Sequence, residues 1–367
     1  MNKKKLLCVI DNLGRGGAEM LLMGILPELN HRFELILVTL SEEFEFDTTQ
    51  LLYHEKYSLG FSGKMSFVTA IFKLKKIIKQ TRPDLVHAHL YNSSIVARAA
   101  CPPGIPLVYS LHTIMSKDAF DSSKWYQWLE KMTLKKGQAV IAVSDAVLQD
   151  YRKLIPLAGP AYVLKNYVSD NFFVPGNGHT GFKHPVHLNL LSVGNIKPVK
   201  NYGYLVKAFE HLLSFPVSLH IFGQGSQEEV AALQQQIDET KVNIQLKGSA
   251  DDISRVLPLY DLFVMPSSYE GFGIAPVEAM AMGLPLLLSD IAVFREITCN
   301  NALFFDLNNP MEFAGIVKDI LAHKYELQQL SVKGLEIAQA NYRKSIYVEK
   351  LFCIYDELLS SSVPIGH

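Results

Sequence analysis

Two glutamates eight residues apart, Glu270 and Glu278, stand in the segment whose residue types best suit chemistry. Glu270 precedes a turn that contains Gly271 and Gly273, and Glu278 follows Pro276, which suits the first turn of a helix. We therefore expect Glu270 on a loop and Glu278 in the first turn of the next helix. A carboxylate can accept two hydroxyl hydrogen bonds, which suits the vicinal diol of a ribose or a sugar. The alternative for Glu278 is an acid that only stabilises the helix dipole.

A candidate anion-binding segment lies between Ser192 and Tyr202. An apolar strand is expected to end at Val193, and Asn201 is the expected N-cap of the helix that follows. Lys200 stands directly before that cap, where its ammonium group and the helix amides can bind one anion. The alternative is an ordinary surface lysine in contact with water.

Glycines after the first expected strand form a second candidate anion site. Gly16 and Gly17 open a helix, so their backbone amides can approach a phosphate closely. Gly14 and Gly16 also begin the glycine pattern of dinucleotide-binding proteins, but Glu19 occupies the position of the third glycine. That pattern therefore fails, and the alternative to an anion site is a tight turn without a ligand.

Three histidines end or follow expected strands. His87 and His89 alternate along one strand, so we expect them to face opposite sides of the sheet and not to bind one metal ion. We expect at least one of the two to be buried and hydrogen-bonded. His112 comes directly after the next strand, and the sequence contains no Asp-x-Asp pair of the kind that binds metals.

Strands and helices that alternate along the chain must position these residues, since ligands of open α/β sheets bind beyond the carboxyl ends of the strands. Apolar runs predict strands at Lys5–Ile10, Glu34–Leu40, Leu85–His89, Leu107–Leu111, Ala139–Val143, Tyr162–Lys165, His187–Val193, Ser218–Phe222, Asn243–Leu246, Leu262–Met265, Leu286–Leu288 and Leu303–Phe305. Amphipathic segments predict helices at Ala18–Leu29, Phe67–Gln80, Asp145–Lys153, Tyr202–Leu213, Gln227–Glu239, Val277–Met282, Met311–His323 and Ser345–Leu358. The pattern predicts two doubly wound α/β units, joined by a linker rich in Pro and Gly at 175–186.

Length and composition exclude several classes of protein. The 367 residues suffice for roughly two domains. A content of 49% hydrophobic and 19% charged residues excludes a disordered or fibrous chain. The net charge of −1 gives no indication of nucleic-acid binding. The four cysteines lack a Cys-x-x-Cys spacing, which favours a reducing cytosol. The apolar run Leu6–Ile10, which follows three lysines, is shorter than the ~7–15 residues of a signal peptide. The longest apolar stretch, Gly273–Leu288, falls short of the ~18 apolar residues of a membrane span.

Charge is distributed unevenly. Residues 1–168 carry 21 Lys and Arg and 15 Asp and Glu, a net charge of +6, whereas residues 169–367 carry 14 and 21, a net charge of −7. The helix Phe67–Gln80 has no acid and carries the lysines Lys73, Lys75, Lys76 and Lys79 with the apolar residues Phe67, Ile71, Leu74 and Ile78 at helical spacing. Such a helix can lie on an anionic membrane surface. The alternative is a packed helix whose lysine face is solvated.

These motifs together resemble glycosyltransferase family 4, and the resemblance covers essentially the whole chain. Its most specific element is the block from Glu270 to Glu278 that continues as Ala-Met-Ala-x-Gly-x-Pro. The supporting motifs are Gly16-Gly17-Ala-Glu19, Pro83-Asp84-Leu-Val-His87-Ala-His89, Leu111-His112, Val143-Ser144, Val193-Gly194, Lys200-Asn201 and Phe222-Gly223-x-Gly225. The resemblance implies the GT-B fold, two Rossmann-like domains that face each other across a cleft.

The resemblance also implies a domain arrangement. Residues 1–168 are expected to form an N-terminal acceptor domain, and residues 169–344 a C-terminal domain that binds the nucleotide-sugar donor. The two domains are expected to meet near residues 166–186. The last helix, with the residues at about 345–367, is expected to cross back to the N-terminal domain.

Roles of single residues follow from the resemblance. In the first domain, Gly16 and Gly17 are expected to contact the donor diphosphate, and His112 to point at the sugar or the reaction centre. In the second domain, Lys200 is expected to bind the diphosphate and Glu278 the ribose hydroxyls. The donor sugar is assigned to Glu270, Gly271, Phe272 and Gly273, and the base to the backbone near Gly248 and Ser249. Glu270, Lys200 and His112 are the expected catalytic residues.

The chain departs from the family at one diphosphate contact. Asn195 stands where the family usually has a second cation, an arginine, and Lys197 or Arg15 is the candidate replacement. The family also often has Asn-Gly near the domain junction, where this chain has Asn166-Tyr167.

The activity implied by the resemblance is transfer of a hexose from a nucleoside diphosphate sugar to a hydroxyl acceptor with retention of the anomeric configuration. The acceptor is expected to be a glycan or a lipid-linked glycan of bacterial polysaccharide synthesis, at the cytoplasmic face of the membrane. No cofactor, metal ion or nucleic acid is expected. The alternatives are a nucleotide-sugar 2-epimerase of the same fold and a non-catalytic nucleotide-binding partner protein.

Overall fold

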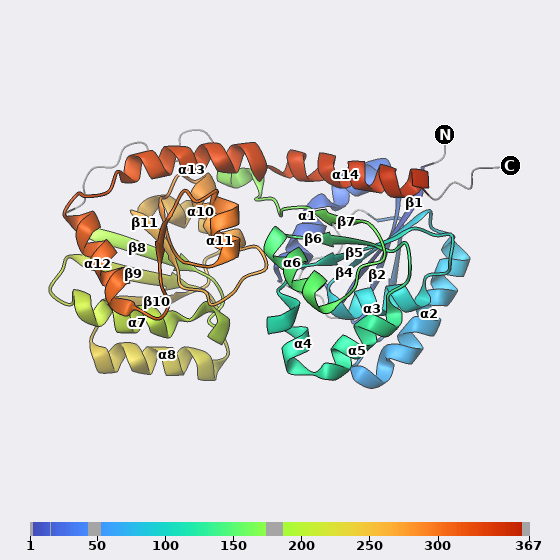
Figure 1. The fold of residues 1–367 in the computed structure, drawn as a ribbon, viewed down its shortest axis with the longest axis horizontal. Helices are drawn as coiled ribbons and strands as arrows, with labels where there is room; N and C mark the ends of the chain where they lie inside the picture. The colour runs from blue at the N-terminus through green and yellow to red at the C-terminus, as the bar shows by residue number, and fades with distance from the viewer. Residues whose placement is uncertain (1–2, 15, 43–52, 174–185, 362–367) are drawn as a thin grey trace. The chain divides into compact units, whose positions relative to one another are not determined.

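A computed structural model describes residues 3–14, 16–42, 53–173 and 186–361, and it divides the chain into two compact units (Figure 1). Unit 1 contains Met1–Tyr167 and Lys344–His367, and unit 2 contains Val168–Arg343. Each unit holds one parallel sheet with its own helices, which is the predicted doubly wound α/β architecture. The predicted linker at 175–186 lies outside the described residues, apart from Val186.

The described part of unit 1 contains a seven-stranded sheet in the order β3-β2-β1-β4-β5-β6-β7. The strands are β1 (Lys5–Ile10), β2 (Glu34–Thr39), β3 (Glu55–Ser58), β4 (Leu85–His89), β5 (Leu107–Leu111), β6 (Ala139–Ala142) and β7 (Ala161–Val163). The helices are α1 (Gly17–Arg32), α2 (Phe67–Thr81), α3 (Tyr91–Ala100), α4 (Ala119–Ser122), α5 (Lys124–Thr133), α6 (Asp145–Leu154) and α14 (Lys344–Ser361). The central strands are buried along nearly their whole length because helices cover both faces of a parallel sheet.

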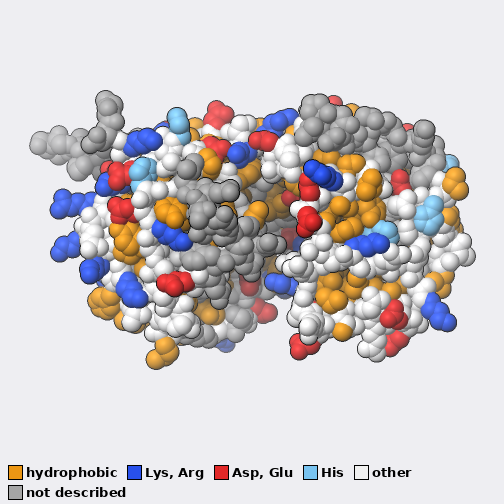
Figure 2. Space-filling view, turned by 180° about the vertical axis from the view of Figure 1, so that it is seen from behind, with side chains coloured by type: hydrophobic (Ala, Val, Ile, Leu, Met, Phe, Trp, Pro, Cys, Tyr) orange, Lys and Arg blue, Asp and Glu red, His pale blue; other side chains and the backbone are white. Residues whose placement is uncertain are grey.

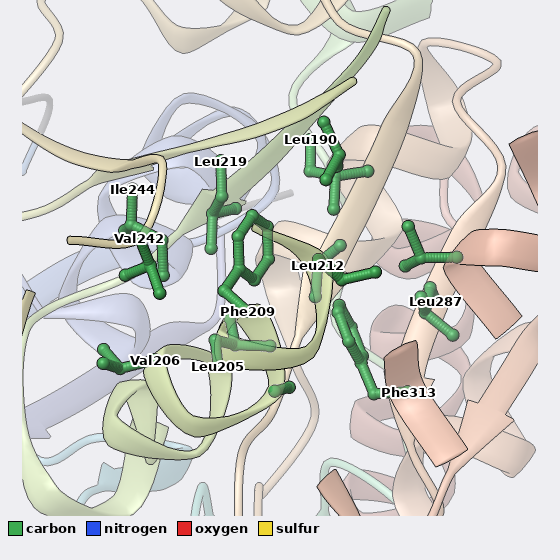
Figure 3. Close-up of a cluster of buried hydrophobic side chains, with 14 of the residues drawn as sticks. Leu190, Leu205, Val206, Phe209, Leu212, Leu219, Val242, Ile244, Leu287 and Phe313 are labelled. Atoms are coloured by element: carbon green, nitrogen blue, oxygen red, sulfur yellow. The ribbon is translucent and has the colours of Figure 1, made fainter. Parts of the chain in front are cut away.

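The described part of unit 2 contains a six-stranded sheet in the order β10-β9-β8-β11-β12-β13. The strands are β8 (Leu188–Val193), β9 (Val217–Phe222), β10 (Ile244–Gly248), β11 (Leu262–Met265), β12 (Leu286–Ser289) and β13 (Leu303–Phe305). The helices are α7 (Tyr202–Phe209), α8 (Gln227–Thr240), α9 (Ile253–Val256), α10 (Ile274–Ala281), α11 (Ala292–Thr298), α12 (Pro310–Leu321) and α13 (Leu327–Asn341). Figure 3 shows Leu205 and Phe209 of α7 among Leu190 of β8 and Leu219 of β9, in the core of this unit.

The strand orders place a topological switch point in each unit. In unit 1 the chain runs from β1 outward through β2 to β3 and then returns to β4 on the other side of β1. In unit 2 it runs from β8 through β9 to β10 and returns to β11 beside β8. Ligands of doubly wound proteins bind outside the carboxyl ends of the strands at such points. Functional residues are therefore sought after β1 and β4, and after β8 and β11.

The last helix, α14, packs on unit 1, as predicted. Its buried side chains Tyr347, Leu351 and Tyr355 join the core formed by β1 and α1. Lys344 pairs with Glu28 of α1 at 2.8 Å. The C-terminal segment is thus part of the N-terminal core.

Helix α2 agrees with the alternative prediction, a packed helix whose lysine face is solvated. Of the apolar residues that its spacing singled out, Phe67, Leu74 and Ile78 are buried in unit 1 and Ile71 is half-buried, so this face is packed against the unit. Exposed apolar side chains lie on a different face of α2, at Val68 and Phe72. Among the helices within the described ranges, none combines the length and the apolar character that crossing a bilayer requires.

Candidate active site

Lys200 and Glu270 form an ion pair at the switch point of unit 2. The ammonium nitrogen of Lys200 lies 2.6 Å from Oε1 of Glu270, and their side chains are 19% and 15% exposed. Ser267 donates a second hydrogen bond, of 2.8 Å, to the same carboxylate oxygen. The two residues are 70 positions apart and meet because they follow the neighbouring strands β8 and β11. The half-buried pair is therefore available to a ligand bound beyond these strands.

Backbone contacts bring the two loops together. The amide of Ser268 donates to the carbonyl of Val199 at 2.9 Å, which links the loop after β11 to the loop after β8. Gly194 leaves room for the lysine, because a Cβ atom there would lie 3.1 Å from Cε of Lys200. At Gly223, a Cβ would lie 1.9 Å from the carbonyl oxygen of Gly194. Glycine is thus required at Gly223, where the loop after β9 approaches the backbone of the loop after β8.

The segment before α7 differs in detail from the prediction. Asn201 precedes α7, but its backbone is in the left-handed region at φ 52° and its side chain makes no capping hydrogen bond. The N-terminal amides of α7 are therefore not capped by Asn201. The side chains of Asn195 and Lys197 are exposed on the loop after β8, and Arg15 lies outside the described residues.

The glycine-rich turn after β11 leads into α10. Gly273 adopts φ 85°, and a Cβ atom there would lie 2.9 Å from the ring of Phe294, so glycine is required for both conformation and space. The side chain of Phe272 is 3% exposed and packs against Tyr342 with ring centroids 5.7 Å apart. Only the backbone of Phe272 is thus available to a ligand, as the predicted amide contact requires. Gly271 is buried in the same turn.

Glu278 lies in the second turn of α10, not the first, because the helix begins at Ile274, ahead of Pro276. Its partial burial raises the pKa of the carboxyl group from 4.5 to about 7. Among the residues that the structure describes, none forms a hydrogen bond or ion pair with this carboxylate. A carboxyl group that is poorly solvated and unpartnered is suited to accept hydroxyl hydrogen bonds from a ligand. Its position in the second turn weakens the alternative of a helix-dipole acid.

Gly248 and Ser249 lie two strands away from β8, at the end of the edge strand β10. Gly248 has φ 69°, and a Cβ atom there would meet nothing within 4 Å. Its carbonyl accepts a 2.8 Å hydrogen bond from Gly223, and Ser249 accepts one of 3.1 Å from Gln224. Gly248 and Ser249 thus lie at the carboxyl end of the strands, as Lys200 does. The predicted contact with the base remains a prediction.

The loop after β1 in unit 1 presents the amino end of α1. Gly16 is the N-cap of α1, and Gly17 is its exposed first residue. Glu19 folds back toward the cap, so that a Cβ atom at Gly16 would lie 2.1 Å from a carboxylate oxygen of Glu19. Burial raises the pKa of this carboxyl group. The residue that breaks the dinucleotide pattern therefore occupies the end of the helix where an anion would bind.

Asp11 also lies in the loop after β1, and the sequence motifs did not predict it as a site residue. It follows β1 and accepts hydrogen bonds from the amide of Ser93 at 2.8 Å and from Asn92 at 2.9 Å. These bonds tie the loop after β1 to the amino end of α3, across the switch point of unit 1. The available signal was its position, as the first charged residue after an apolar strand.

The histidines of unit 1 correct the prediction about the faces of the sheet. His87 and His89 face the same side of the sheet, with ring centroids 3.9 Å apart, because residues two apart on a strand share a face. His87 is buried and hydrogen-bonded, to Tyr355 at 2.6 Å and to Ser110 at 2.8 Å. The prediction that at least one of the pair is buried and satisfied is thus confirmed.

His112 follows β5 and stands next to this pair, with its ring 5.8 Å from that of His89. Among the described residues, neither ring nitrogen of His112 nor of His89 has a hydrogen-bond partner. Burial lowers the pKa of His112 to about 4. The imidazole is therefore neutral at pH 7, and it can exchange hydrogen bonds with a neutral ligand group but cannot supply a positive charge.

Two doubly wound units with polar residues at their switch points are the architecture of the GT-B glycosyltransferases, and solved structures of that class share the fold of this chain. The family described as "Glycosyltransferase Family 4" matches residues 15–172, and "Glycosyl transferases group 1" matches residues 187–335. The chain belongs to glycosyltransferase family 4 and is an enzyme that transfers a glycosyl group.

Known proteins are similar over most of the chain. The EpsF protein of Bacillus subtilis (strain 168) is 25% identical over 316 residues, which are 79% of this chain and 80% of the relative. The Escherichia coli UDP-Gal:alpha-D-GlcNAc-diphosphoundecaprenol alpha-1,3-galactosyltransferase is 28% identical over 241 residues, 60% of this chain and 62% of that enzyme. Anabaena Alr3699/HepE, solved in complex with UDP-glucose, shares the fold with a TM-score of 0.80 at 19% identity, covering 96% of this chain and 99% of that chain.

Proposed function

We propose that the protein transfers a hexose from a nucleoside diphosphate sugar to a hydroxyl group of a glycan or lipid-linked acceptor, with retention of the anomeric configuration. The observation that carries this proposal is the Lys200–Glu270 pair at the switch point of unit 2, together with the unpartnered Glu278 in α10, the helix that follows Glu270 in the chain. A cation supports departure of a diphosphate, and the carboxylates suit the hydroxyl groups of a sugar and a ribose. The names of the relatives support UDP-sugars as the first donors to test.

In the proposed reaction, the bond between the anomeric carbon and the diphosphate oxygen breaks while the acceptor oxygen bonds to the same face of that carbon. The acceptor proton moves to the departing phosphate. Lys200 stabilises the negative charge that develops on the diphosphate. Glu270 releases Lys200 to the diphosphate and binds the sugar hydroxyls. His112, neutral at pH 7, orients the sugar through a hydrogen bond.

The direct test replaces Lys200. We expect Lys200→Gln to lower kcat/KM by about 2–4 kcal/mol of transition-state stabilisation, because the diphosphate loses a preorganised cation. Lys207→Gln is the matched control, since Lys207 is an exposed lysine of α7. Lys197→Gln shows whether that residue replaces the arginine missing at Asn195. Normal turnover of a folded Lys200→Gln variant would contradict the proposal.

The donor is found by a thermal-shift screen against UDP-, GDP- and ADP-sugars. Release of free nucleoside diphosphate is then measured with and without candidate acceptors. A transferase releases the diphosphate in an acceptor-dependent way. A 2-epimerase alters the donor sugar without an acceptor, and a non-catalytic partner protein binds the nucleotide without turnover.

We also propose that the enzyme attaches to the cytoplasmic face of a membrane through α2, where a lipid-linked acceptor is held. The face of α2 predicted for this role is buried, so the proposal now depends on the opposite, exposed face with Lys75, Lys76 and Lys79. Liposome co-sedimentation at low salt tests it. Equal binding to neutral and anionic vesicles would contradict it.

A further inference from the structure

A pocket of about 720 Å³ lies in unit 1 at the amino ends of strands β4, β5 and β6. It is bordered by Pro83, Ile105 and Lys135, which precede β4, β5 and β6. At the other end of these strands, His89 is the last residue of β4 and His112 follows β5. A five-residue strand spans roughly 17 Å, so a ligand in this pocket cannot touch the groups after the strands.

The pocket combines a cluster of cations with apolar walls. Four of its residues are cationic, Lys75, Lys79, Arg82 and Lys135, and the other described residues that line it are apolar. Among the described residues, no carboxylate forms an ion pair with any of the four. Lys135 is held in place by a 3.1 Å hydrogen bond to the carbonyl of Cys101. Four unpaired cations around one cavity create a positive potential that favours an anionic ligand.

An exposed apolar stripe leads along α2 to this pocket. Met65, Val68 and Phe72 are 95%, 62% and 66% exposed. Val68 and Phe72 continue at spacings of three and four residues into Lys75 and Lys79, so these four share one face of α2, and Met65 lies in the 3-10 turn Lys64–Ser66 that precedes the helix. Figure 2 shows a face of unit 1 on which Lys and Arg side chains lie beside exposed apolar side chains. A free phosphate would satisfy the cations but leave the stripe in water, whereas a lipid contacts both.

We propose that this pocket binds the phosphate headgroup of an anionic membrane lipid. The four cations hold the phosphate, and the apolar walls and the stripe at Val68 and Phe72 contact the adjoining acyl chains. The inference rests on the proposed membrane attachment and names the lipid group that α2 recognises. Because the pocket lies at the far edge of the sheet, the bound lipid anchors the enzyme and is not its acceptor.

Vesicle binding of charge variants tests this proposal. We compare Lys75→Gln/Lys79→Gln with Arg152→Gln/Lys153→Gln, an equal loss of charge on the exposed surface of α6 in the same unit. Each lysine near an anionic surface contributes about 1 kcal/mol, so we expect the pocket variant to bind phosphatidylglycerol vesicles roughly 25-fold more weakly. The α6 variant should bind like the parent. Vesicles of phosphatidylcholine alone should bind neither.

Two further measurements distinguish a lipid phosphate from a free phosphate, and failure of the lipid proposal from failure of the proposed transferase function. Val68→Ser/Phe72→Ser should weaken binding to anionic vesicles and leave any binding of inorganic phosphate unchanged. Equal loss in the pocket and α6 variants, or unchanged vesicle binding of the serine variant, would overturn the proposal. Nucleoside diphosphate release with a soluble acceptor and no vesicles should be normal in the pocket variant. If the parent protein itself releases no nucleoside diphosphate with a soluble acceptor, the result contradicts the proposed transferase function and not the lipid proposal.

Discussion

Glu270 and Glu278 differ in how the protein holds their carboxylates, and they should differ in kinetics. Glu270 is assigned to the sugar near the reacting carbon, so Glu270→Gln should cost on the order of 2–4 kcal/mol, chiefly in kcat. Glu278 is assigned to the ribose, remote from the chemistry, so Glu278→Gln should cost about 1–3 kcal/mol, chiefly in donor KM. Initial rates against donor concentration check both. Normal kcat with a raised KM for Glu270→Gln would mean that the two roles are exchanged.

The raised pKa of Glu278 predicts a pH-dependent stability. The folded pKa of about 7 exceeds the ordinary value of 4.5, so the folded state holds the proton more tightly. The free energy of unfolding should therefore fall as the pH rises from about 4.5 to 7 and then stay level. Glu278→Gln lacks this fall and should be more stable than the parent by about 1–3 kcal/mol at pH 8, with little difference at pH 4. Urea unfolding at both pH values measures this. Equal stability at pH 8 would contradict the assigned burial.

At the scale of elements, a buried ion pair joins three helices of unit 1. Arg98 of α3 binds Glu130 of α5 through two hydrogen bonds, one of 2.6 Å, and Tyr151 of α6 donates to the same carboxylate. The side chains of the pair are 0% and 1% exposed. Both charges are thus removed from water and depend on each other.

Breaking this pair should weaken unit 1. Arg98→Met leaves the Glu130 carboxylate buried without its cation and should cost about 3–5 kcal/mol, whereas Arg98→Met/Glu130→Leu should recover most of that loss. The exposed pair between Arg32 and Asp356 is the control, and Asp356→Asn should cost less than about 1 kcal/mol. Urea unfolding compares these variants. Similar losses for Arg98→Met and Asp356→Asn would show that burial does not set the cost.

The sequence predicted elements best where apolar runs had clear ends. The bounds of β1, β4, β5 and β11 agree with the prediction, because each is a short, mainly apolar segment. Helix α3 was missed because it is buried almost all round, from Ser93 to Ala100, so that it shows no amphipathic period. Its N-cap, Leu90, also has φ 71°, a conformation that the local sequence does not predict.

The candidate site was predictable as residue types but not as contacts. Lys200, Glu270 and Glu278 were found because each follows an expected strand. The ion pair between the first two depends on β11 returning beside β8, which is a property of the strand order and not of either loop. The error on His87 and His89 came from misapplying the two-residue period of a strand.

At the scale of the whole molecule, the hydrophobic core of unit 1 is built from both ends of the chain. Unit 1 and unit 2 have separate hydrophobic cores, yet α14 contributes to the first although it follows the second in the chain. Tyr355 of α14 is buried and binds His87 of β4 at 2.6 Å. The stability of the N-terminal unit therefore depends on residues near the C-terminus.

A substitution in α14 should consequently weaken unit 1 and spare unit 2. Leu351 is 0% exposed in the core shared with β1 and α1, so Leu351→Ala should cost about 2–5 kcal/mol of the stability of unit 1, through lost burial and the cavity left behind. Lys350→Ala, on the exposed side of the same helix, should change it by less than about 0.5 kcal/mol. If the two units unfold separately, calorimetry of the full chain gives one transition for each. Only the melting temperature of the unit 1 transition should fall. A loss confined to unit 2, identified by its shift with a bound nucleotide, would contradict the assignment of α14 to the N-terminal core.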